Sequence, residues 1–206
     1  MLGTTGATLA IALGATTTGG SHKIKVSMIE CTSLNKAPAG CLQYFTGISG
    51  TVSTYNHQGG RNLHNQFYST CVRQEFGYCT VDFREAPTAI QAFNTGSFFG
   101  GPGFPPTVQT VCDFFDNGFL VIPNDVIEIT NLGGGFPPVF SVIKSGVRCG
   151  SAFGNIFFDD TPGTVRYTGA TPFILTYFTA LNSDATSDID DVPGTGYALD
   201  YSQVPC

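Results

Sequence analysis

Three observations predict that this 206-residue chain folds as an all-β protein, an antiparallel β-sandwich cross-linked by disulfides. Apolar residues recur mostly at every second position, and no stretch keeps the apolar spacing of an amphipathic helix over several turns. Gly, Pro and Asn interrupt these runs about every ten residues, as the turns of sandwiches and barrels do. The seven cysteines are dispersed without a CxxC pair, which favours disulfides formed in an oxidising compartment.

The strands are predicted where apolar alternation persists between two such turns. In chain order they are residues 7–13, 23–29, 43–46, 50–55, 66–72, 78–83, 118–121, 126–129, 139–142, 155–158, 164–167, 173–179 and 197–204. Their short lengths and polar separators predict packed antiparallel sheets rather than a parallel sheet with helical crossovers.

Composition narrows the classes of partner. Charged residues make up only 12% of the chain, against about 25% in an average soluble domain. The formal net charge is −6 and no basic run occurs, so nucleic acid and anionic membranes are poor partners. Residues 8–15 are apolar but too short to span a membrane, and neither Lys nor Arg precedes them as in a signal peptide, so we assign them to the mature protein.

Two loops stand out because both end in Gly-Phe-Pro-Pro, at residues 103–106 and 135–138. Gly frees the backbone and Pro-Pro holds it extended. Each loop could present an aromatic anchor to a partner, which makes Phe99, Phe104 and Phe136 candidate binding residues. The alternative is that these loops only connect strands and blunt the sheet edges.

A short internal repeat relates the two ends of the chain. Residues 24–31 (IKVSMIEC) align with residues 199–206 (LDYSQVPC), and each segment ends in a cysteine. Upstream, residues 8–15 are similar to residues 172–179. The repeat predicts that residues 1–31 are the last two strands of a preceding module, although a chance match would look the same.

Three separated motifs resemble the CUB domain, in the variant found in arthropod extracellular proteins. They are residues 41–56, beginning CLQYFTG, residues 63–79, ending EFGYC, and residues 196–206, GYALDYSQVPC. The resemblance implies a CUB-like sandwich of the jelly-roll type at 41–206, with insertions around residues 94–107 and 131–145, after a linker at 32–40.

The resemblance also implies a disulfide framework. Carried over by position, Cys41 pairs with Cys71 and Cys112 pairs with Cys149, and each bridge would stabilise the fold by roughly 3–4 kcal/mol. The two remaining cysteines of the module, Cys79 and Cys206, are then expected to pair with each other. Cys31 is left over, and it either bonds to a partner outside the module or remains a buried free thiol.

Some CUB domains bind calcium through one Glu and two Asp. The matching positions here are Glu75, Asp113 and Asp184, with Asp116 or Asp188 as substitutes, and oxygen ligands of this kind suit calcium. The alternative is a solvated acidic loop around Asp184. No other cofactor is expected.

Catalytic motifs are not found in the sequence. It contains three histidines and no nucleophile elbow, metalloprotease helix signature or phosphate-binding loop. We therefore expect a secreted, non-enzymatic module that binds an extracellular protein or carbohydrate, with Tyr55 and Tyr68 as further aromatic contacts. The alternative is a matrix or assembly subunit that polymerises through a sheet edge or through Cys31.

Overall fold

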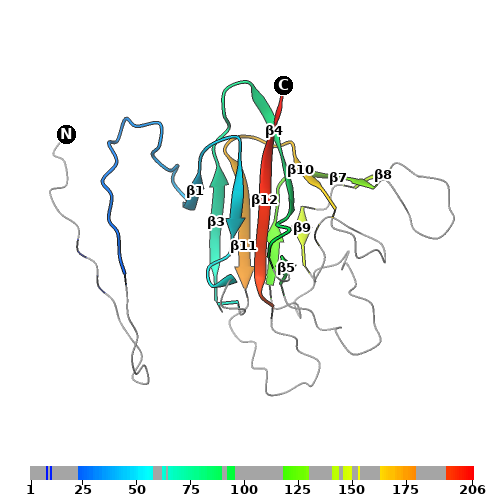
Figure 1. The fold of residues 1–206 in the computed structure, drawn as a ribbon, viewed down its shortest axis with the longest axis horizontal. Coiled ribbons are helices and arrows are strands. Elements are labelled where there is room, and N and C mark those ends of the chain that lie inside the picture. Colours follow the sequence, from blue (N-terminus) through cyan, green and yellow to red (C-terminus); the bar gives the residue numbers. More distant parts are fainter. Residues whose placement is uncertain are drawn as a thin grey trace, which may run out of the picture. The chain divides into compact units, whose positions relative to one another are not determined.

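The structure is a computed structural model that divides into two compact units, Met1–Lys36 and Ala37–Cys206. The residues that it describes are 8, 10, 23–57, 62, 63, 65–89, 92–95, 118–129, 141–143, 146–149, 153, 163–179 and 194–206, with backbone alone at 126–129 and 141–143. Within these residues the second unit is a sandwich of two β-sheets (Figure 1). No helix long and apolar enough to cross a membrane occurs in the described part of the chain.

One sheet has five strands in the order β1-β3-β11-β6-β9. Their bounds are β1 Cys41–Phe45, β3 Phe67–Val72, β11 Phe173–Thr179, β6 Gly118–Val121 and β9 Val147–Arg148. The pair β1 and β3 is parallel, and every other neighbouring pair is antiparallel. The long strand β11 lies in the middle of this sheet, and its alternating residues bury one face and leave the other half-exposed.

The other sheet has seven strands, six of them in the order β2-β12-β4-β10-β7-β8, while β5 pairs with one end of β12. Their bounds are β2 Ser49–Ser53, β12 Gly196–Pro205, β4 Tyr78–Glu85, β10 Val165–Tyr167, β7 Asp125–Ile129, β8 Ser141–Ile143 and β5 Phe93–Asn94. All pairs are antiparallel. The last strand, drawn in red in Figure 1, runs the length of the sandwich and pairs with β2 on one side and β4 on the other.

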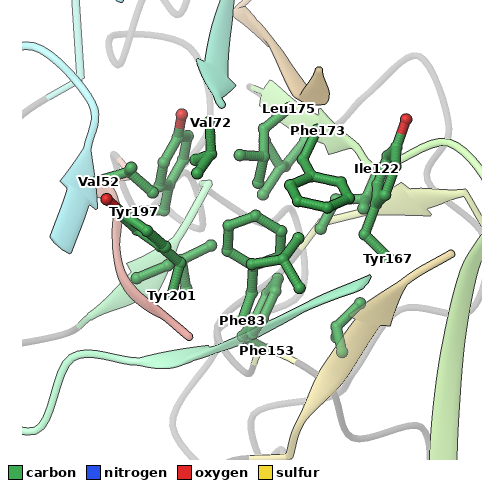
Figure 2. Close-up of a cluster of buried hydrophobic side chains, with 14 of the residues drawn as sticks. Val52, Val72, Phe83, Ile122, Phe153, Tyr167, Phe173, Leu175, Tyr197 and Tyr201 are labelled. Atoms are coloured by element: carbon green, nitrogen blue, oxygen red, sulfur yellow. The ribbon is translucent and has the colours of Figure 1, made fainter. Parts of the chain in front are cut away.

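The core lies between the two sheets and is rich in aromatic rings. These rings belong to Phe and Tyr, because the chain has no Trp. Strand β11 contributes Phe173, Leu175 and Tyr177, all at most 1% exposed. The facing sheet contributes Phe83 and Leu199, both fully buried. Figure 2 shows side chains of both sheets converging on this core. Burying each such side chain stabilises the fold by about 1.5–3 kcal/mol.

Two disulfides join the pairs that the resemblance implied. The Sγ atoms of Cys41 and Cys71 bond across the parallel pair β1–β3. Those of Cys79, near the start of β4, and Cys206, at the end of the sequence, bond to each other. Cys149 is also disulfide-bonded, but Cys112 lies outside the described residues, so the Cys112–Cys149 pair stays a prediction. Among the described cysteines, Cys31 has a free and exposed thiol, which removes the alternative of a buried one.

Residues 23–29 are assigned to no strand and no described strand pairs with them, so the strand predicted there stays a prediction. The predicted strands at 7–13 and 155–158 fall mainly or wholly outside the described residues. Strands β5 and β9 were not predicted, since two residues are too few to show an alternation.

Candidate functional site

The connection between β3 and β4 forms a short protruding turn, residues 73–78, which we call the Glu75 turn. The Tyr78 N–H donates to the Glu75 carbonyl at 3.1 Å, and the Cys206 N–H donates to the Gly77 carbonyl at 3.0 Å. Gly77 has φ of +84°, a conformation that L side chains rarely adopt. The turn is therefore closed locally and fixed to the C-terminal residue, next to the Cys79–Cys206 disulfide.

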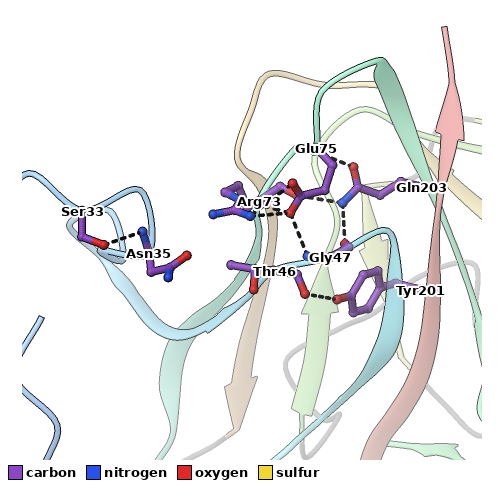
Figure 3. Close-up of polar contacts among 8 residues, drawn as sticks. All are labelled: Ser33, Asn35, Thr46, Gly47, Arg73, Glu75, Tyr201 and Gln203. Atoms are coloured by element: carbon purple, nitrogen blue, oxygen red, sulfur yellow. Dashed lines mark hydrogen bonds and ion pairs between the residues drawn. The ribbon is translucent and has the colours of Figure 1, made fainter.

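The Glu75 carboxylate joins this turn to the neighbouring β1–β2 turn. Its Oε1 accepts from the Gly47 N–H at 2.8 Å and from Arg73 Nε at 3.0 Å, and its Oε2 accepts from Arg73 Nη2 at 3.1 Å. Figure 3 shows the two side chains facing each other. The Gly47 N–H, and then the Arg73 guanidinium, lower the pKa of Glu75, so the carboxylate is held in its charged form.

Strand β12 supports both turns from below through one amide side chain. Gln203 is 5% exposed, and its Oε1 accepts from the Glu75 N–H at 2.9 Å. Its Nε2 donates to the Gly47 carbonyl at 2.8 Å and to the Arg73 carbonyl at 2.7 Å. Two residues earlier, the Tyr201 hydroxyl donates to the Thr46 carbonyl at 3.3 Å. The amide thus uses both of its N–H donors and its oxygen to hold backbone groups.

Within the Glu75 turn, the side chain of Phe76 is exposed to solvent. Its exposed fraction is 102%, the highest of the large apolar residues in the described part of the chain. Ile48, in the neighbouring turn, is 51% exposed. Phe76 was not predicted as a contact residue, because the predicted contacts lay in the Gly- and Pro-rich loops. The signal that could have found it is a Phe directly before a turn Gly, between two β runs.

The calcium site predicted from the sequence stays a prediction, because Glu75 is the one residue of its set that the structure describes. Both carboxylate oxygens of Glu75 accept from Arg73, and the guanidinium supplies the positive charge that a metal ion would otherwise provide. No group of three or more His, Cys, Asp or Glu placed to hold a metal occurs among the described residues. Asp113, Asp184, Asp116 and Asp188 lie outside them.

Of the aromatic contacts predicted from the sequence, Tyr68 needs a correction. It is 7% exposed, packs 5.0 Å from Tyr55 between ring centroids, and accepts a hydrogen bond from the Tyr55 N–H through its hydroxyl. Burial raises its pKa to about 12. It faces inward because β3 places alternate residues in the core. Tyr55 is 39% exposed, while Phe99, Phe104 and Phe136 lie outside the described residues.

A second surface, on the outer face of the seven-stranded sheet, is a shallow groove of ≈ 850 Å³. Asp82, Arg84 and Asp200 line one side, and small apolar residues of the segment after β4 line the other. Arg166 donates two hydrogen bonds to Asp82 at 2.7 and 2.9 Å, and Thr51 donates to Asp200. The carboxylates of Asp82 and Asp200 in this groove are therefore already hydrogen-bonded to neighbouring side chains.

Comparison with known families identifies the domain to which both surfaces belong. A profile of the animal CUB domain matches residues 38–204, a range that contains the twelve described strands but for the final Pro205 and includes the whole Glu75 turn. A search of curated protein sequences finds no match to the chain. The two-sheet sandwich and its disulfides agree with the fold of the matched family.

Proposed function

Since this chain belongs to the animal CUB domain family, whose members are non-catalytic modules, we propose that it binds an extracellular protein and that Phe76 is its central contact residue. The observation that carries the proposal is a fully exposed Phe on a turn that hydrogen bonds tie to the β1–β2 turn and to β12. An exposed Phe forgoes about 1.5–3 kcal/mol of burial, which insertion into a partner's pocket would recover.

The hydrogen bonds that hold the Glu75 turn favour a binding role for Phe76 over an incidental exposure of the ring. Binding costs free energy when side chains and loops must be ordered, and a turn already fixed by Glu75, Gln203 and Cys206 avoids much of that cost. An apolar ring inserted into a pocket at the centre of an interface is a common hot spot. Phe76 has no hydrogen-bonding group, and Ile48 in the β1–β2 turn is also apolar and exposed, which favours a protein pocket over a carbohydrate.

The disulfides support the extracellular setting, because such bonds persist mainly in oxidising compartments. The motifs at residues 63–79 and 196–206 support the arthropod variant of the family. Phe99, Phe104 and Phe136 are proposed as additional contacts.

The test is to replace Phe76 by a photo-crosslinking phenylalanine analogue, identify the protein captured from extracellular fluid, and measure its dissociation constant with defined variants. Phe76→Ser is expected to weaken binding about 30-fold, the equivalent of a hot spot worth roughly 2 kcal/mol. Phe67→Ser is the matched control, because Phe67 is also a mainly exposed Phe, 78%, at the opposite end of β3. Equal affinities for the two variants would contradict the proposal.

A matrix or assembly role is the second candidate function, and the exposed thiol of Cys31 is the observation that favours it. Light scattering on the chromatographed protein separates the two functions. A polymer that grows with concentration and dissolves on reduction would support assembly, whereas a reducible link confined to one polypeptide would count against it.

A further inference from the structure

The N-terminal unit exposes an unusually apolar extended segment. Ile24 is 53% exposed, Val26 is 77% exposed and Met28 is 96% exposed, and these three residues alternate with Lys25 and Ser27. In the part of the chain that the structure describes, no strand pairs with residues 23–30. A segment with this alternation buries one face in a sandwich when a partner sheet is present.

The structure shows what each position of the matching segment does in the second unit. Leu199 and Tyr201, the counterparts of Ile24 and Val26, are 0% and 3% exposed and lie in the core. Ser202, the counterpart of Ser27, is exposed on the outer face. The apolar and polar positions of residues 24–27 therefore follow the core and solvent faces of β12 in register.

The cysteines that end the two segments extend this correspondence. Cys206 bonds to Cys79 on β4, the strand that pairs with β12. Cys31 occupies the same place in its segment, and its thiol is free and exposed. A cysteine at the end of a terminal strand would meet a counterpart of Cys79 only if that strand lay in a second sandwich.

We propose that residues 23–31 are the last strand of a second CUB-like sandwich, whose other strands lie N-terminal to them in the same polypeptide, and that Cys31 is disulfide-bonded to that sandwich's counterpart of Cys79. The order of elements favours the same polypeptide over a second copy. β12 is the last strand of its module, and residues 23–31 would be the last strand of theirs. After a short connection, β1 then begins a module that already has its own last strand.

The bond requires an oxidant. Two thiols lose two protons and two electrons when they form a disulfide, and the disulfide of a secretory-pathway oxidoreductase accepts them and becomes a dithiol. One difference between the segments concerns a hydrogen-bonding position. Met28 stands where β12 has Gln203, and a thioether cannot donate the two hydrogen bonds that Gln203 gives to Gly47 and Arg73.

The first test maps Cys31 in the protein taken from its natural source, alkylated before extraction and digested with trypsin without reduction. Cleavage after Lys25 and Lys36 isolates Cys31 in residues 26–36. The expected result is that this peptide is linked to a peptide not found in residues 1–206, within one polypeptide larger than 21.8 kDa after reduction. An alkylated Cys31, or a link between two copies of the same peptide, would overturn the proposal.

The second test compares two substitutions in the full-length secreted polypeptide. Val26→Asp places a carboxylate on the face assigned to the core, and Ser27→Asp places the same group on the face assigned to solvent. Val26→Asp is expected to leave Cys31 open to alkylation in most molecules, while Ser27→Asp leaves it bonded. Equal alkylation of Cys31 in the two variants would overturn the assigned register. This outcome does not depend on whether Phe76 binds a partner.

Discussion

Residues 24–31 and residues 199–206 have nearly the same pattern of apolar, polar and cysteine positions, but the structure buries only the second segment. Leu199 is fully buried, whereas Ile24, its counterpart, is 53% exposed. The difference lies in the neighbours, because β12 pairs with β2 and β4 and packs against the facing sheet. A strand pattern therefore predicts which face can be buried, while the presence of partner strands decides whether it is.

The comparison can be tested by making equivalent substitutions in the two segments of the 206-residue chain. The largest difference is expected for the cysteines. Replacing Cys79 and Cys206 together by Ser opens a loop of 127 residues and should lower the free energy of unfolding by roughly 3–5 kcal/mol. Cys31→Ser should change it by less than about 0.5 kcal/mol, as at an ordinary surface position. Urea denaturation measures both, and a large loss for Cys31→Ser would show that Cys31 is bonded within this chain.

The next difference is expected for the core positions. Leu199→Ala leaves a cavity between the sheets and should lower the free energy of unfolding by about 2–5 kcal/mol. Ile24→Ala removes a half-exposed side chain, so a change within about 0.5 kcal/mol is expected. Thermal or urea unfolding distinguishes the two cases. A loss at residue 24 as large as that at residue 199 would mean that the segment is packed within the chain.

A smaller difference is expected where Gln203 and Met28 correspond. Gln203→Met fits a side chain of similar length but removes three hydrogen bonds to the Glu75 and β1–β2 turns. The expected loss is about 1–3 kcal/mol, because buried backbone groups lose their partners. Faster hydrogen exchange at the Glu75 N–H should accompany it. The reciprocal change, Met28→Gln, should leave stability and exchange unaltered, and similar effects of the two changes would contradict the comparison.

The smallest effect is expected from pH. The folded-state pKa of Glu75 is lowered by the Gly47 N–H and the Arg73 guanidinium. Its charged form therefore contributes stability above its ordinary pKa of 4.5, and that contribution is lost as the pH falls through the folded value. Glu75→Gln should reduce the loss of stability in acid, whereas Glu30→Gln in the exposed segment should not. Identical acid limbs for wild type and Glu75→Gln would show that the Glu75 interactions contribute nothing.

Much of the sandwich could be predicted from the sequence, because alternation is a local property. The strand at Phe173–Thr179 was predicted with its bounds, and the last strand within one residue at each end. The candidate site was less accessible. Tyr68 was predicted as a contact residue but lies in the core, and Phe76 was not singled out although it is fully exposed. Which face a ring occupies depends on the opposing sheet, which the local pattern does not contain.

The sequence by itself determined the all-β class and the placement of most strands, since periodicity is readable along the chain. Its cysteine-bearing motifs, through their resemblance to a known family, indicated the Cys41–Cys71 and Cys79–Cys206 pairs. Only the tertiary structure decided that Glu75 bonds to Arg73 and Gly47, that Gln203 holds both turns, and that residues 24–31 stay uncovered while residues 199–206 do not. The physical reason is that hydrogen bonds and burial arise between segments far apart in the chain, so each depends on which surfaces the fold brings together.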